Sequence, residues 1–179
     1  MHGEHLPEEI HLTGFREFMR YDPESGLVVW VKKPTTRSPV KPGKEVGSFE
    51  SNGYRQVHVY WSGERRGFMV HRICWYLFYG TWPELPIDHI NRDKGNNQLS
   101  NLRLATPGLN GRNKNLLPNN TSGRRGVHWD KREGKWKGQV TLHNKQKHLG
   151  YFDDLDEAAE AVEDFYRELD GDEYRSPYE

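Results

Sequence analysis

The segment Ile-Asp-His-Ile at residues 87–90 constrains the fold of this 179-residue chain more than any other part of its sequence. It is short, apolar at both ends and entered from a proline, which predicts a brief strand. The stretch that follows, residues 91–97, is rich in asparagine and charge and is typical of a loop. Residues 101–105 predict a second strand, and Thr106 followed by Pro107 predicts a helix start with threonine as the N-cap. We therefore expect a compact unit of strand, loop, strand and helix.

Four polar side chains lie where this unit would bring them together: Asp88, His89, Asn101 and Asn110. Asp88 offers a carboxylate, and Asn110, in the first turn of the expected helix, offers a carboxamide oxygen. Hard cations such as Mg²⁺ or Mn²⁺ prefer such oxygen ligands. His89 is a suitable general base near neutral pH. The combination indicates metal-assisted hydrolysis of a phosphodiester.

The alternative is that these are ordinary loop residues, because a single Asp-His pair carries little information. The specificity comes from the spacing, which is twelve residues from His89 to Asn101 and nine more to Asn110. Neighbouring residues of a strand point to opposite faces, so the strand must bend if Asp88 and His89 are to serve one phosphate.

Asp-His-Ile-Asn at 88–91, Asn-Asn-x-x-x-Asn-Leu-Arg at 96–103 and the following Asn110 resemble the HNH endonucleases. The resemblance is to the phage and intron-encoded homing enzymes, in which asparagine replaces the last histidine, and it spans roughly residues 15–116. It implies that Asp88 and Asn110 bind the metal and that His89 is the base. It also implies that Asn101 orients His89 or braces the hairpin. Zinc-stabilised members of the family need cysteine pairs; this chain has one cysteine, so we expect no structural zinc.

The segment 71–79 is the most apolar part of the chain and ends at Gly80, which predicts the core helix of the first domain. His71 stands at its start. It is either a packed, hydrogen-bonded histidine or a residue near the active site, and the sequence leaves both open. Upstream, residues 15–19 predict a short helix, and residues 27–31 and 53–61 predict strands.

Composition describes a polar protein with modest cores: 34% of the residues are hydrophobic and 29% are charged. No window approaches the roughly 18 consecutive apolar residues of a membrane-spanning helix, and the first residues lack the apolar region of a signal peptide. A single cysteine excludes an intramolecular disulfide and any multi-cysteine zinc site. We therefore expect an intracellular protein, and the resemblance to phage homing enzymes implies the cytoplasm of a bacterial host cell and a phage origin.

The formal net charge of zero conceals two blocks of opposite sign. Residues 103–147 hold eleven lysines and arginines against two acids, a surplus of nine positive charges. From residue 153 onward there are twelve acids against two arginines, a surplus of ten negative charges. Charges that only keep the surface hydrated would alternate in sign along the chain. This segregation instead indicates a surface that binds a polyanion, most simply nucleic acid.

Residues 126–152 predict a three-stranded meander, with turns near residues 132–134 and 143–145. Residues 156–166 predict an amphipathic helix with Ala158, Ala161, Val162 and Phe165 facing the sheet. The sheet carries most of the basic side chains and the helix most of the acids, so the two charge blocks become two faces of one small domain.

Residues 121–170 resemble the APETALA2 DNA-binding domain, through Arg125-Gly126-Val127, Lys135-Trp136, the run 148–152 and Glu157-Ala158-Ala159. In that family the sheet lies in the major groove and the helix packs behind it, which implies double-stranded DNA as the partner. The implied contacts are Arg124, Arg125, His128, Lys135, Trp136, Lys137, Gln139, Thr141 and His148. Arginine could read guanine and glutamine adenine, while Lys135 and Lys137 would hold phosphates. Trp129 could equally be core or contact.

The expected fold class is α+β: a ββα-metal (HNH) nuclease domain followed by a small domain of a three-stranded antiparallel sheet plus a helix. We place the nuclease domain with its N-terminal β-rich extension at residues 1–116, a linker at 117–122 and the DNA-binding domain at 123–179. The expected function is a divalent-metal-dependent DNA endonuclease that works as a monomer or weak dimer. A non-catalytic DNA-binding or regulatory protein on a relic HNH fold is the second hypothesis, and cleavage of RNA or structured junctions is a third.

Overall fold

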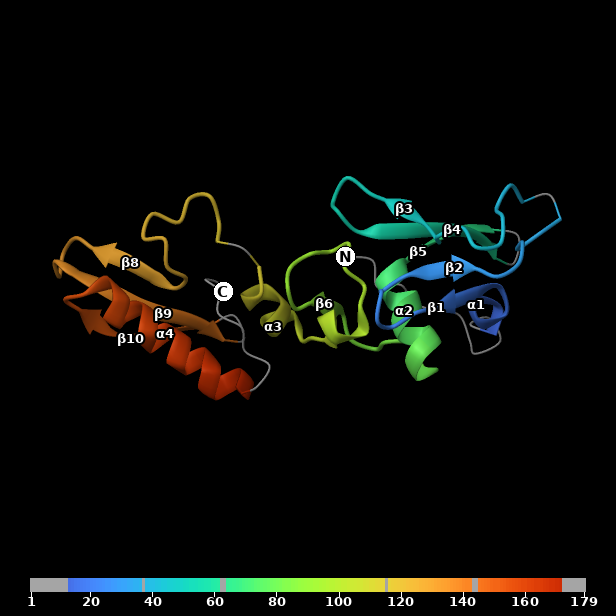
Figure 1. The fold of residues 1–179 in the computed structure, drawn as a ribbon. Coiled ribbons are helices and arrows are strands. Elements are labelled where there is room, and N and C mark those ends of the chain that lie inside the picture. The colour runs from blue at the N-terminus through green and yellow to red at the C-terminus, as the bar shows by residue number, and fades with distance from the viewer. Residues whose placement is uncertain (1–12, 37, 62–63, 115, 143–144, 172–179) are drawn as a thin grey trace. The chain divides into compact units, whose positions relative to one another are not determined.

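The structure is a computed structural model that describes residues 13–36, 38–61, 64–114, 116–142 and 145–171. Its chain divides into two compact units, residues 1–104 and 105–179, and each is described by itself. The expected mixture of helices and small antiparallel sheets is confirmed (Figure 1).

The first unit holds three small antiparallel sheets and two helices. Its elements are α1 (Thr13–Phe18), β1 (Met19–Tyr21), β2 (Val28–Trp30), β3 (Ser48–Phe49), β4 (Arg55–Trp61), β5 (Glu64–Met69), α2 (Val70–Tyr79), β6 (Ile87–His89) and β7 (Leu102–Leu104). Strands β1 and β2 form one pair, β3, β4 and β5 form a meander, and β6 and β7 form the hairpin of interest. A short 3₁₀ turn, η1 (Leu99–Asn101), leads into β7.

Helix α2 forms the centre of this unit, where the sequence predicted a core helix. It follows β5 directly and ends at Gly80, whose left-handed backbone (φ 83°) lets its N–H donate to the Tyr76 carbonyl at 2.9 Å. Ile73 and Cys74 on its inner face are fully buried, among core residues from α1, β1 and β2. The β6–β7 hairpin is anchored to the same core, because Ile87 of β6 and Leu102 of β7 pack into it.

The second unit contains a short helix, α3 (Pro107–Arg112), and the expected meander with its helix. The elements of the meander are β8 (Val127–Asp130), β9 (Lys135–Leu142), β10 (Lys145–Phe152) and α4 (Leu155–Asp170), with β9 in the middle of the sheet. Figure 1 shows α4 lying along one side of this sheet. Asp154 caps α4 by accepting from the backbone N–H groups of Asp156 and Glu157.

The buried face of α4 differs in part from the predicted one. Ala158 and Val162 are buried as expected, and Phe165 is partly buried and packs against the same core, whereas Ala159 and Tyr166 are buried in addition and Ala161 is only partly buried. Tyr166 is covered by the neighbouring α3, because the guanidinium of Arg112 lies over its ring at 5.1 Å.

An ion pair ties α3 to α4 within the second unit. Arg112 Nε donates to Asp170 Oδ2 at 2.6 Å, and a second guanidinium nitrogen donates to Asp170 Oδ1. The compact units therefore divide before α3, whereas the predicted linker at residues 117–122 lies after it. That residues 117–122 link two independently folding domains stays a prediction. No helix among the described residues is long and apolar enough to span a membrane.

Candidate active site

His89 ends β6 and is one of the most buried polar residues of the first unit, with 3% of its surface exposed. It lies opposite Leu102 in the β6–β7 ladder, and the preceding Asp88 lies opposite Arg103. The chain turns immediately afterwards, since the Arg92 N–H donates to the His89 carbonyl at 2.9 Å and Arg92 has a positive φ of 65°. The histidine thus stands at the junction between a strand and a tight turn.

The His89 imidazole contacts the side chain of a residue from the following loop. His89 Nε2 lies 3.1 Å from Asn97 Oδ1, and both side chains are buried. Two further rings border it: His71 at a centroid distance of 5.2 Å and nearly perpendicular, and Tyr54 at 5.8 Å. The sequence left open whether His71 is a packed histidine or a residue near the active site. In the structure it is packed and also lies next to His89, the candidate base.

Burial lowers the pKa of both histidines. For His89 desolvation lowers the pKa, while the hydrogen bond with Asn97 and the charge of Asp88 oppose that shift. For His71 desolvation, followed by repulsion from His89 and Arg72, lowers the pKa to about 3. Both rings are consequently neutral near pH 7, which is the form in which an imidazole can accept a proton.

Asp88 lies in a buried ion pair across the hairpin. Arg103 donates to Asp88 Oδ2 from Nε at 3.0 Å and from Nη2 at 2.9 Å. The side chains of Asp88 and Arg103 are only 6% and 12% exposed. A buried carboxylate needs a compensating charge, and Arg103 supplies it through two donors.

Asn101 braces the loop that connects the two strands. Its Oδ1 accepts from the Asn91 N–H at 2.9 Å, and its Nδ2 donates to the Asn96 carbonyl at 2.7 Å. The Asn101 carbonyl also accepts from the Ile90 N–H at 2.9 Å. These contacts tie the loop together around one carboxamide. Of the two roles that the resemblance implied for Asn101, orienting His89 or bracing the hairpin, these contacts correspond to bracing.

The same loop is held from outside by the turn between β1 and β2. The Tyr21 hydroxyl donates to the Asn97 carbonyl at 2.7 Å, and the Leu99 N–H donates to the Pro23 carbonyl at 3.0 Å. Gly26, in this turn, has a φ of 76° and approaches so closely that a Cβ there would lie 2.5 Å from the Gln98 nitrogen. The β1–β2 turn therefore fixes the loop that carries Asn97.

Asn110 lies in the first turn of α3, as expected, and its N–H donates to the Thr106 carbonyl at 3.0 Å. Thr106 caps the helix, because its Oγ1 accepts from the Leu109 N–H at 3.3 Å. Asn110 belongs to the second unit, and its place in a metal site stays a prediction. Among the described residues there is no cluster of three or more histidine, cysteine, aspartate or glutamate side chains that could hold a metal ion.

Six of the nine candidate DNA contacts share one face of the β8–β9–β10 sheet. Gly138 and Val140 of β9 are buried on the α4 side, so the alternate residues point away from the helix. The ladder pairs His128 with Lys137, and His148 with Gln139, on that outer face. The outer-face set is His128, Lys135, Lys137, Gln139, Thr141 and His148.

The other three candidates lie elsewhere. Trp136 is on the α4 side, partly buried against the core, so it does not share the outer face. Arg124 pairs with Asp156 at 2.7 Å, and Arg125 donates to the Lys114 carbonyl. Trp129 is 47% exposed and packs edge-on against Trp136 at 5.1 Å, so it lies outside the core without joining the outer face.

Sequence reasoning gave no role to Asn97 or Arg103, although both stand in the quoted motif at 96–103. The doubled asparagine was the available signal for Asn97. The signal for Arg103 was strand pairing. When two strands of equal length, β6 and β7, pair across their connecting loop, Arg103 lies opposite Asp88.

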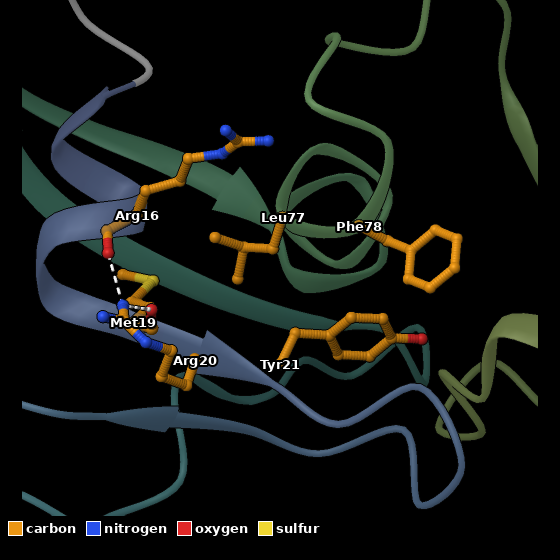
Figure 2. Close-up of a pocket in the computed structure, with 6 residues that line it drawn as sticks. All are labelled: Arg16, Met19, Arg20, Tyr21, Leu77 and Phe78. Carbon is orange, nitrogen blue, oxygen red and sulfur yellow. Dashed lines mark hydrogen bonds between the residues drawn. The ribbon is translucent and has the colours of Figure 1, made fainter.

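A hollow on the first unit lies beside this region (Figure 2). It is lined by Arg16, Met19, Arg20, Tyr21, Leu77 and Phe78. Arg20 donates to the Met19 carbonyl at 2.8 Å, and the guanidinium of Arg16 lies over the Tyr76 ring at 5.3 Å. Arg20 thus braces the α1–β1 junction and Arg16 packs against α2, and the hollow stays outside the candidate site.

Comparison with known proteins assigns a class to the central segment. Residues 68–112, which run from the end of β5 through α2 and the β6–β7 hairpin to α3, match the profile of the family described as HNH endonuclease. That match covers about a quarter of the chain and contains Asp88, His89, Asn97, Asn101 and Asn110.

A curated relative of this chain is Protein 3.8 of Escherichia phage T7, which is 45% identical over 60 residues. The match covers 34% of this chain and 50% of that protein, so the chain spans about half the length of this curated relative. Among solved structures, one of DNA binding and cleavage by the HNH homing endonuclease I-HmuI aligns with a TM-score of 0.43 and 26% identity. It covers 57% of this chain and 55% of that one, and we carry no residue position over from it.

Proposed function

We propose that the chain is a divalent-metal-dependent DNA endonuclease of the homing type, with His89 as the general base. The observation that carries this proposal is the β6 strand within the HNH-like segment. In this strand the buried imidazole of His89 directly follows Asp88, a buried carboxylate that is held by Arg103. Such a pair at the start of a tight turn suits activation of a water next to a phosphodiester.

The residues present fit a hard cation by their chemistry. Asp88 offers carboxylate oxygens and Asn110 a carboxamide oxygen, and these are ligands that Mg²⁺ or Mn²⁺ accepts. Asn110 enters this set on the sequence resemblance alone. When bound, the cation would neutralise charge that develops on the phosphate and on the leaving oxygen.

The chain's own residues supply the remaining roles. His89, neutral because its pKa is lowered by burial, would take the proton of the attacking water on its imidazole ring. Arg103 holds the Asp88 carboxylate in one orientation through two donors. Asn101 braces the loop around the base.

The second unit would bind double-stranded DNA through the outer face of its sheet, as the resemblance to APETALA2 domains implies. Lys135 and Lys137 would contact phosphates, while Gln139 and His148, which are paired across β9 and β10, would face base edges. Lys135 lies 3.0 Å from Asp153 in an exposed pair, which DNA can displace at little cost. One base per chain suits nicking by a monomer, and double-strand cleavage would need two successive nicks or a dimer.

The test is the variant His89→Ala on supercoiled plasmid with Mg²⁺. Removing a general base typically costs about 10²- to 10⁴-fold in rate, so we expect nicking to be nearly abolished while gel-shift affinity for DNA stays within twofold. His58→Ala is the matched control, because His58 is an exposed histidine on β4 and should leave nicking unchanged. Undiminished nicking by His89→Ala would reject the proposed function in favour of a DNA-binding protein on a relic fold. Cleavage of RNA in place of plasmid DNA would change the substrate and keep the base.

A further inference from the structure

We propose that Asn97 is the positioning residue of the base: its side-chain oxygen holds the proton of His89 on Nε2 and so makes Nδ1 the basic nitrogen. This inference rests on the proposed function of His89. It adds a residue with a stated task and the identity of the ring atom that accepts the proton.

The contact itself determines the direction of the hydrogen bond. His89 Nε2 lies 3.1 Å from Asn97 Oδ1, and both residues are nearly completely buried. A carboxamide oxygen only accepts hydrogen bonds, so the ring nitrogen must be the donor. A neutral imidazole carries one proton, and that proton therefore stays on Nε2, leaving the lone pair on Nδ1.

Asn97 can impose this geometry because its own backbone is fixed from a distant part of the chain. Its carbonyl accepts from the Tyr21 hydroxyl at 2.7 Å. A Cβ on Gly26 would lie only 2.7 Å from the Asn97 carbonyl carbon, which shows how closely the β1–β2 turn approaches the Asn97 backbone. A catalytic side chain is held to within about 0.5 Å only when its supporting residues are themselves locked in place.

Packing controls the remaining freedom of the ring. His71 lies edge-on to His89, with an interplanar angle of 87°, and Tyr54 borders it at a tilt of 53°. These two rings set the plane of the imidazole, while Asn97 sets which of its nitrogens carries the proton. The two constraints are separable, so replacing Asn97 should change the tautomer without releasing the ring from its pocket.

The first experiment measures the tautomer directly in the full chain. Long-range ¹H–¹⁵N NMR of protein with ¹⁵N-labelled histidine distinguishes protonated from unprotonated ring nitrogens, and His89→Ala assigns the signals. At pH 8 and without metal, we expect His89 to carry its proton on Nε2. A proton on Nδ1 in the unmodified protein would overturn the proposal, and this reading does not depend on whether any Asn97 variant folds.

The second experiment measures the cost of losing the acceptor. Asn97→Leu keeps the size of the side chain and removes the oxygen, and we expect the kcat for nicking to fall about 10- to 100-fold, the range seen for partners that orient a functional histidine. The KM for plasmid should stay within about twofold. Asn97→Asp restores an acceptor and should recover most of the lost kcat.

Asn96→Ala is the matched control for damage to the loop. Asn96 Oδ1 accepts from the Gln98 N–H at 3.1 Å, so this variant removes a loop hydrogen bond next to Asn97 and leaves the His89 contact in place. We expect its kcat to stay within about threefold of the unmodified protein.

The outcomes separate the two proposals. Full nicking by His89→Ala rejects the proposed function and this inference together. A folded Asn97→Leu protein with an unchanged kcat and an unchanged His89 tautomer, alongside an inactive His89→Ala, rejects the inference alone.

Discussion

His71 is the residue whose burial has the clearest consequence for stability. It is almost fully buried against His89 and Tyr54, and desolvation lowers its pKa to about 3 from the ordinary 6.5. Between those values the unfolded chain binds a proton that the folded chain does not. Stability is therefore fully present above about pH 6.5 and falls as the pH drops, by at most about 1.4 kcal/mol per pH unit from this group.

Urea unfolding at pH 7.5, 6.0 and 5.0 measures this slope. We expect His71→Phe, which keeps an aromatic ring and cannot titrate, to have a shallower decline in unfolding free energy than the unmodified protein. His58→Ala, at an exposed position, should keep the original slope. Equal slopes for His71→Phe and the unmodified protein would show that His71 is already protonated in the folded state.

The contacts of single residues were also the part of the site least accessible from the sequence. Asp88, His89 and Asn101 could be selected because residue type and spacing limit their chemistry. The doubled asparagine and the strand pairing pointed to Asn97 and Arg103 as residues, but their partners did not follow, because a hydrogen bond is decided by strand register and loop path. His71 is eighteen positions before His89, and only the packing of α2 against the hairpin brings their rings to 5.2 Å.

At the scale of the elements, the helices whose sequences carry clear start, stop or periodicity signals were predictable. Helix α2 has a glycine at its end, α3 has a threonine cap with a following proline, and α4 has a regular apolar period, and all three formed where expected. The finer differences follow from tertiary contacts. Tyr166 is buried in addition to the predicted residues, and Arg112 of α3 covers its ring, a contact between elements far apart in sequence.

The turn between β1 and β2 acts on the site through Gly26. Gly26→Ala would place a methyl group 2.5 Å from the Gln98 nitrogen and must displace the loop that carries Asn97. We expect a loss of unfolding free energy above the roughly 1–2 kcal/mol that a positive φ alone costs a residue with a side chain, together with a lower kcat for nicking.

Gly43→Ala is the matched control for this element. Gly43 has a similar φ of 83°, but a Cβ there meets nothing within 4 Å, so only the backbone cost remains. Thermal unfolding and plasmid nicking on both variants separate strain from displacement. The same stability loss and the same kcat in the two variants would mean that the loop tolerates the methyl group and that the turn does not fix it.

At the scale of the whole molecule, the charges are segregated although the formal net charge is zero. In the second unit, lysines of the central strand point outward from the sheet, while α4 on the opposite side begins with Asp156 and Glu157. This arrangement gives a polyanion one favourable face and one repulsive face. Under the proposed function, binding and cleavage would be tasks of different units, and they should respond differently to salt.

Lys137→Gln tests this division of tasks. Each phosphate contact contributes a slope of roughly −0.9 to the dependence of log K on log salt for duplex DNA, so we expect the slope to become shallower by about one and affinity to weaken similarly for all sequences. Lys147→Gln is the control of equal charge, because Lys147 lies over the Phe165 ring on the α4 side, 4.5 Å from its centroid. Fluorescence anisotropy across a salt series gives both slopes.

Nicking kinetics give a second reading of the same variant. In Lys137→Gln the kcat for nicking at saturating protein should stay unchanged, because the variant removes only a DNA contact, while KM should rise. If Lys137→Gln and Lys147→Gln changed the salt slope and the affinity equally, the two faces could not be distinguished. That result would reject the outer face of the sheet as the binding surface.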